Sequence, residues 1–265
     1  MTDAPTLLAA YDAQLRGENE VLGATTRVRL GPLWVATWGR RRGFITAADP
    51  EAVALADPRA LVAEALEAAA ADPEVAVVEW KTRGHDRDAG LLDALVAAGF
   101  VPQEPESIMI GAAQLLALDL PLPDGVTLRA ATTPEDVRRG SAAADRAFGE
   151  EPDEDRVAET MARIAGGDEL WIAEAGGEIV CTGRLSPVPG TEFAGIWGGA
   201  TDAAWRRRGI YRALTAERAK SAVRRGVRYI NSDSTEGSRP ILERGGFTKV
   251  STTTPYEWHR GTPGG

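Results

Sequence analysis

The chain has almost none of the residues that build metal centres and disulfides. Its 265 residues include one cysteine, Cys181, and two histidines, His85 and His259, which lie far apart in the sequence. A lone cysteine forms no internal disulfide and no multi-thiolate metal site, and two distant histidines do not make a histidine cage. We therefore expect no metal in the functional site.

Long apolar segments are also missing. No stretch approaches 18 uncharged apolar residues, and Met1–Ala10 has no basic segment followed by an apolar core. Neither a membrane span nor a signal peptide is indicated. The sequence predicts a cytoplasmic protein that does not associate with membranes.

Positive charge is in short supply. The formal net charge is −9, which argues against nucleic-acid binding because affinity for phosphate backbones depends on a basic surface. Residues 1–120 carry 10 Lys and Arg against 18 Asp and Glu, whereas residues 121–265 carry 20 against 21. Most cations lie in the second half, where we expect an anionic ligand.

The composition that remains is that of a globular protein, with 43% hydrophobic and 26% charged residues. The length predicts one large domain or two small ones. The segment Leu118–Gly125, LDLPLPDG, has two prolines and ends in an Asp-Gly turn signal, so it is interpreted as a linker. The predicted domains are therefore 1–117 and 126–265.

Both halves contain a strand, a helix, a Gly-Phe turn and another strand. The Gly-Phe pairs are Gly99-Phe100 and Gly246-Phe247, 147 residues apart. The second half predicts strands at Val126–Arg129, Leu170–Ala175, Glu178–Leu185, Glu192–Thr201 and Arg228–Asn231, and helices at Pro134–Phe148, Asp155–Ile164, Ile210–Arg225 and Ile241–Arg244. The first half predicts strands at Thr25–Leu30, Leu33–Thr37 and Val75–Trp80, and helices at Arg59–Ala70 and Leu91–Ala97. The order predicts a mixed α/β (α+β) sheet in which the first half is a reduced copy of the second.

Helix ends are marked by their usual residues. Thr133 is a candidate N-cap with Pro134 at the first helical position, and Gly226 stands where a C-cap glycine belongs. The apolar residues of Ile210–Arg225 share one face, and we expect Arg212, Arg218 and Arg225 to lie largely off it.

A phosphate-binding arrangement follows the Gly-rich strand. The strand ends in Gly198-Gly199-Ala200-Thr201, and after a short bend Arg206-Arg207-Arg208-Gly209-Ile210-Tyr211 opens a helix. The first N–H groups of a helix lack internal acceptors and attract anions, and arginines add charge-assisted hydrogen bonds. A solvated basic turn is the alternative. The same tetrapeptide at Arg40–Gly43 precedes no helical pattern, so we interpret that copy as a charged hairpin turn.

This loop resembles that of the GNAT N-acetyltransferase superfamily, whose pattern is Arg or Gln, any two residues, Gly, any one, then Gly or Ala. The resemblance covers roughly residues 125–258, and the first half is similar to a degenerate second GNAT domain without the loop. It implies two GNAT-like domains, the N-terminal one reduced, with acetyl-CoA as the cofactor. The residues that it assigns to acetyl-CoA are Ala200, Thr201, Arg206, Arg207, Arg208, Gly209, Ile210, Tyr211 and Thr235.

Two positions depart from the family pattern. Tyr211 replaces the final small residue, so we expect its ring to point away from the phosphate. Leu242 stands where many members have a Tyr that protonates the departing thiolate, so that acid is not carried over.

The catalytic candidates are Asp233, Glu192 and Ser238. Asp233 and Glu192 are candidate bases for removing a proton from an alkyl ammonium, whose pKa is about 10. Each has a structural alternative: an Asx turn for Asp233, a solvated carboxylate for Glu192 and a helix cap for Ser238. Cys181 alternates within a strand and is interpreted as a core residue.

The sequence thus predicts an acetyl-CoA-dependent N-acyltransferase that acts on a small-molecule amine or an exposed amino group by direct attack. The alternative is a catalytically silent acyl-CoA sensor or partner-binding module. The acceptor, the acyl-chain preference and the oligomeric state, monomer or homodimer, stay open.

Overall fold

The computed structural model describes residues 3–39 and 41–261. Its contacts divide the chain into two compact units. Unit 1 comprises residues 1–108, 233–236 and 250–265, and unit 2 comprises residues 109–232 and 237–249. This division differs from the boundary expected at 118–125, because unit 2 already begins at Met109 and the chain returns to unit 1 at residues 233–236 and 250–265. Residues 117–125 themselves contain no helix or strand, as expected of a linker.

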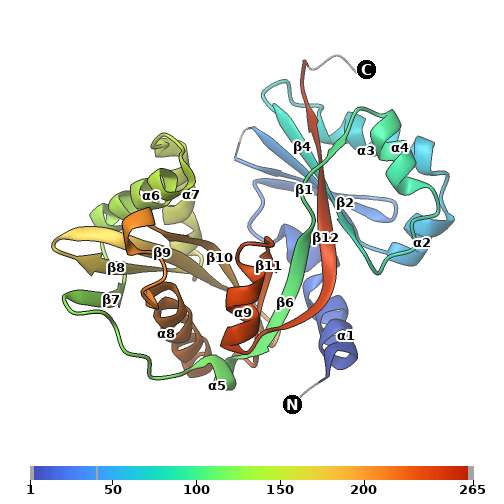
Figure 1. The fold of residues 1–265 in the computed structure, drawn as a ribbon. Coiled ribbons are helices and arrows are strands. Elements are labelled where there is room, and N and C mark those ends of the chain that lie inside the picture. The colour runs from blue at the N-terminus through green and yellow to red at the C-terminus, as the bar shows by residue number, and fades with distance from the viewer. Residues whose placement is uncertain (1–2, 40, 262–265) are drawn as a thin grey trace. The chain divides into compact units, whose positions relative to one another are not determined.

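Unit 1 is built from an N-terminal helix and a sheet with helices (Figure 1). Its helices are α1 (Ala4–Leu15), the 3-10 turn Gly17–Val21, α2 (Pro50–Leu55), α3 (Pro58–Ala69) and α4 (Leu91–Ala97). Its strands are β1 (Thr26–Leu30), β2 (Leu33–Trp38), β3 (Arg42–Ala47), β4 (Val77–Arg83) and β5 (Val101–Pro102), joined by parts of β6 (Glu106–Ala112) and β12 (Thr248–His259). The order within the unit is β1-β2-β3-β4-β12, with β5 also on β12.

Unit 2 is built from strands with helices on both faces. Its helices are α5 (Ala113–Leu116), α6 (Pro134–Phe148), α7 (Glu154–Ala165), the 3-10 turn Ala203–Trp205, α8 (Ile210–Arg224) and α9 (Arg239–Gly245). Its strands are β7 (Val126–Ala130), β8 (Glu169–Ala175), β9 (Glu178–Pro187), β10 (Phe193–Thr201) and most of β11 (Tyr229–Ser234), in the order β11-β10-β9-β8-β7. Figure 1 shows α6 and α7 on one face of this sheet and α8 on the other.

The two units repeat one topology. In unit 2, β10 is antiparallel to β9 and parallel to β11, and α8 connects the two parallel strands. In unit 1, β3 is antiparallel to β2 and parallel to β4, with α2 and α3 in the connection. Gly99 and Gly246 both have left-handed backbones, and Phe100 and Phe247 are both buried. The predicted repeat is therefore confirmed.

The capping residues predicted for α6 and α8 are confirmed in detail. Thr133 Oγ1 accepts from the Asp136 amide and the Asp136 side chain caps in return, which makes a capping box in front of Pro134. Gly226 has φ +77° just after α8. The tetrapeptide Arg40–Gly43 was predicted to form a charged hairpin turn. Arg41 and Gly43 do lie in the β2–β3 hairpin, on either side of the first residue of β3. Arg40 lies outside the described residues.

Candidate functional site

The last part of β10 departs from regular pairing. Trp197 is opposite Arg184 of β9, but the next paired residue is Ala200, opposite Thr182, so Gly198 and Gly199 form a bulge. Gly198 has φ +59°, which favours glycine. The bulge turns the backbone of β10 out of its ladder just before the arginine loop.

On its other side, β10 parts from β11 before the bulge. The parallel pairs run only from Phe193–Tyr229 to Gly195–Asn231. Past this point, Ser232 Oγ donates to the Ile196 carbonyl at 3.2 Å, and the buried Asn231 Oδ1 has no hydrogen-bond partner within the described residues. The two strands therefore separate at the carboxyl ends of parallel strands, where α/β proteins bind ligands.

The arginine loop leaves its main-chain donors open. Trp205 N–H donates to the Asp202 carbonyl, and the first amide to donate into α8 is that of Ala213, to the Gly209 carbonyl at 3.0 Å. The amides of residues 209–212 therefore precede the first helical hydrogen bond. Gly209 has φ +82° and exposes its backbone without a side chain. This arrangement suits an anion at the start of a 15-residue helix.

The three arginines have different surroundings. Arg206 braces the loop, because its Nε donates to the Thr201 carbonyl at 3.0 Å and its Nη2 to the Ala147 carbonyl at 3.3 Å. The Arg208 guanidinium lies 4.8 Å from the ring centre of Trp205. Arg207 is exposed with φ +62°, a conformation unusual for a residue with a side chain. Arg207 and Arg208 are the arginines left to meet a ligand.

Tyr211 fills the space beneath the bulge. A Cβ placed on Gly199 would lie 2.4 Å from Tyr211 Cε2, so the ring packs directly against that glycine; it is partly buried and packs against the core of unit 2. Only a glycine at position 199 leaves room for the ring. Ala200 is buried nearby, and Thr201 Oγ1 lies 3.1 Å from Cys181 Sγ.

Arg218 was expected to lie off the buried face of α8, and this is wrong. Its exposure is 0%, and it donates to the Arg184 carbonyl at 3.1 Å and to Thr215 Oγ1 at 3.0 Å. Its Nε has no partner within the described residues. Burial lowers the pKa of this guanidinium. Arg218 follows Leu214 and precedes Ala222 by four residues, and this helical spacing already indicated a buried position.

Cys181 is a buried core residue, as predicted. It lies on β9 with 1% exposure. Burial raises the pKa of its thiol, so little thiolate forms at neutral pH.

Two of the catalytic candidates lie in unit 2 at positions that favour structural roles. Glu192 precedes β10, at the end opposite the bulge, and its Oε1 lies 3.1 Å from Arg228 Nη1. Ser238 is the N-cap residue of α9, but its side chain makes no cap hydrogen bond. Its carbonyl instead accepts from the Ile241 and Leu242 amides. Leu242 is buried in the core.

Asp233 and Thr235 belong to unit 1 rather than to the unit with the loop. Asp233 lies within β11, which continues to Ser234. Asp233 Oδ2 lies 2.6 Å from Lys81 Nζ, and both side chains are largely buried. Lys81 also lies 3.7 Å from Glu20, and Glu20 pairs with the buried Arg83. The carboxylates around Lys81 raise its pKa, so the ammonium stays charged.

Within the described residues, no group of three or more His, Cys, Asp and Glu side chains could hold a metal ion. No helix in residues 3–39 and 41–261 is long and apolar enough to cross a membrane.

Comparisons with known proteins agree with this geometry. Residues 137–247 match the model of the Acetyltransferase (GNAT) family. Comparison with curated proteins gave no match.

Among solved structures, a GCN5-related N-acetyltransferase from Kribbella flavida is 18% identical, with TM-score 0.67 over 98% of this chain and 95% of that one. A GCN5-related N-acetyltransferase from Sphaerobacter thermophilus is 20% identical, with TM-score 0.64 over 86% and 76% of the two chains. A tandem GNAT protein from the clavulanic acid biosynthesis pathway is 18% identical, with TM-score 0.61 over 88% and 82%. These likenesses show the fold, including its tandem arrangement.

Proposed function

We propose that the protein, whose residues 137–247 match the model of the Acetyltransferase (GNAT) family, transfers an acetyl group from acetyl-CoA to a primary amine by direct attack. The acceptor is a small molecule or an exposed amino group. One observation carries the proposal. The bulge at Gly198 and Gly199, the arginine loop and the open start of α8 follow one another in a single unit.

The residues present fit the cofactor. The open amides of residues 209–212 would hold the diphosphate, with Arg207 and Arg208 beside it. The bulge of β10, which has lost its ladder partners, would hydrogen-bond the pantetheine arm in the manner of an added strand. Acetyl-CoA supplies an activated acyl group with a good leaving thiolate.

The attacking amine must lose a proton, and the two carboxylates predicted as candidate bases, Asp233 and Glu192, are both ion-paired. Asp233 is ion-paired with Lys81, and Glu192 with Arg228. We therefore assign deprotonation of the ammonium to water instead of either carboxylate. With Leu242 in the core, no side chain is assigned to protonate the thiolate.

A silent acyl-CoA-binding module is the second candidate, favoured by Leu242 and by the ion pair on Asp233. Thiol release from acetyl-CoA, followed with a panel of amines, separates the two. The enzyme releases thiol with at least one amine. The module binds CoA in calorimetry but releases none.

Cofactor binding itself is tested with matched arginine variants. Arg207→Gln and Arg208→Gln should each raise the Kd for CoA about tenfold, the loss of roughly one charge-assisted hydrogen bond. Arg41→Gln, in the tetrapeptide copy of unit 1, should leave the Kd unchanged. Equal effects of all three, or no heat with CoA at all, would contradict the proposal.

A further inference from the structure

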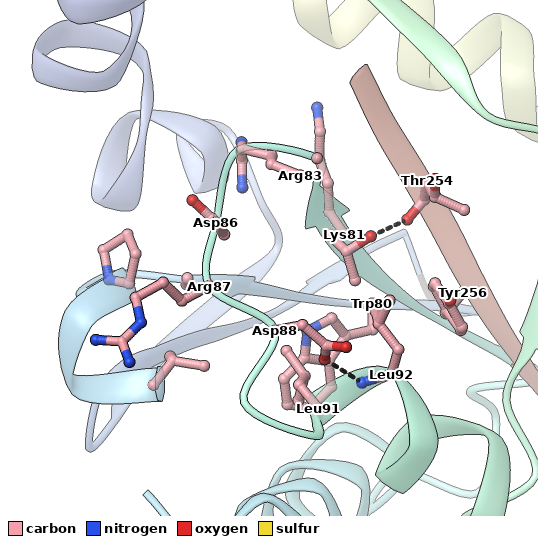
Figure 2. A pocket seen from close by; sticks show the side chains of 15 residues that line it. Trp80, Lys81, Arg83, Asp86, Arg87, Asp88, Leu91, Leu92, Thr254 and Tyr256 are labelled. Carbon is pink, nitrogen blue, oxygen red and sulfur yellow. Dashed lines mark hydrogen bonds between the residues drawn. The ribbon is translucent and has the colours of Figure 1, made fainter. Parts of the chain in front are cut away.

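Unit 1 contains a cavity of about 200 Å³ (Figure 2). The side chains of Val53, Trp80, Leu91, Leu92 and Tyr256 give it an apolar lining. Trp80 is 1% exposed and packs edge-on against Phe100, so this wall is rigid. The volume equals that of roughly seven liquid waters at about 30 Å³ each, which suits a small organic molecule.

The cavity occupies a place in unit 1 that matches the ligand cleft proposed in unit 2. The parallel pairs of β3 and β4 end at Ile45–Trp80, and the cavity begins directly after them, at Ala47 and Trp80. Ligands of α/β folds bind at the carboxyl ends of parallel strands. The position therefore favours a binding site over a packing defect.

Helix α2, which contributes Pro50 and Val53 to the cavity, does not suit a diphosphate. It begins with Pro50, which has no N–H, and Asp49 Oδ1 already accepts from the Ala52 amide at 3.1 Å. Glu51 adds a negative charge in the first turn. The cavity thus lacks the open donors that α8 offers, and its ligand belongs to another chemical class.

Among the described residues that line the cavity, the carboxylates are Asp86, which pairs with Arg16, and Asp88, which accepts from the Leu92 amide. The lining cations are Lys81, Arg83 and Arg87. Lys81 is paired with Asp233, and Arg83 with Glu20. Arg87 is exposed and has no carboxylate within ion-pair distance in the described part of the chain. Figure 2 shows Arg87 on the α2 side of the cavity, with Trp80, Leu91 and Leu92 on the α4 side. A ligand lying between the two sides of the cavity meets apolar surface on the α4 side and the Arg87 guanidinium on the α2 side.

From this arrangement we infer that the cavity of unit 1 binds a small carboxylic acid with a flat or branched apolar body. The body packs on Leu91 and Leu92, which are partly exposed, and the carboxylate pairs with Arg87 near solvent. This site is separate from the proposed cofactor site and does not depend on acyl transfer.

Calorimetry with phenylacetate and its neutral isostere phenylacetamide tests this. The full chain should bind phenylacetate saturably at about millimolar concentration or tighter, and at least about fivefold more tightly than phenylacetamide. Arg87→Gln should abolish the difference between the two ligands, because it removes the charge but keeps a polar side chain. Arg41→Gln serves as the control and should preserve the difference.

A filling variant tests the location. Leu91→Trp should abolish binding of both ligands while CoA binding stays unchanged, and thermal unfolding confirms that the variant folds. The inference is overturned if neither ligand saturates up to about 10 mM, or if binding survives both Arg87→Gln and Leu91→Trp. If Leu91→Trp does not fold, the Arg87→Gln result decides alone.

Discussion

The contact between Gly199 and Tyr211 makes the sharpest prediction about the candidate cofactor site. Gly199 does not have a left-handed backbone, so alanine is conformationally acceptable there. Its Cβ, however, would lie 2.4 Å from Tyr211 Cε2 and 3.0 Å from the hydroxyl oxygen. Carbon atoms normally approach to about 3.5–4.0 Å. We expect Gly199→Ala to lower the free energy of unfolding by about 1–3 kcal/mol, the usual cost of overpacking.

The neighbouring glycine provides a matched control. Gly198 has φ +59°, and a Cβ there meets nothing within 4 Å. Gly198→Ala should therefore cost about 1 kcal/mol from backbone strain alone. Tyr211→Ala should offset the loss of stability caused by Gly199→Ala but not the loss caused by Gly198→Ala. In urea denaturation, the double variant Gly199→Ala/Tyr211→Ala should be about 1–2 kcal/mol more stable than the sum of its single effects predicts.

The same variants report on the cofactor. Because the ring supports the bulge from below, Gly199→Ala should displace the bulge and raise the Kd for CoA about tenfold, and the second substitution should restore most of that loss. Strict additivity of the Gly199 and Tyr211 effects, in both stability and CoA affinity, would refute the reasoning.

Three other outcomes are expected. Asp233→Asn should lower the free energy of unfolding by about 3 kcal/mol in urea because it removes the carboxylate nearest the largely buried Lys81 ammonium and leaves only Glu20, at 3.7 Å. A purely catalytic Asp233 would lose rate at unchanged stability. Hydrogen bonds from Arg129 hold the pKa of Asp136 well below its ordinary value, so the stability that the ionised Asp136 adds is present above about pH 4 and is lost as the pH falls. Asp136→Asn should therefore flatten the acid limb of a plot of unfolding free energy against pH. An unchanged slope in the variant would contradict this role of Asp136. Cys181 should react with a thiol reagent only as the chain unfolds, and fast labelling of the native protein would contradict its burial.

The parts of the fold that the sequence predicted well are those decided by neighbouring residues. The capping box at Thr133 and the glycine after α8 depend on residues within a turn or two of each other. The arginine loop was predictable for the same reason, since its strand, bend and helix start are contiguous.

What the sequence did not predict depends on distant partners. Asp233 is held by Lys81, 152 residues earlier in the chain, and no local pattern announces that pair. Arg218 was misplaced because charge was given more weight than helical spacing, whereas carbonyl and hydroxyl acceptors satisfy two of its nitrogens in the core. β3 was missed because Phe44–Thr46 is too short to show an alternating pattern, although pairing with β2 and β4 fixes it as a strand.

The return of the chain to unit 1 affects how the protein folds during synthesis. β4 pairs with β12 from Arg83–Thr253 to Val77–His259, and Thr82 and Thr253 are 171 residues apart. At about 5–20 residues per second, the ribosome leaves that edge of β4 unpaired for roughly 10–35 s. An open strand edge invites association with other chains. Nascent polypeptides halted before residue 250 should therefore need chaperone protection, and they should aggregate more readily than chains halted a few residues after His259.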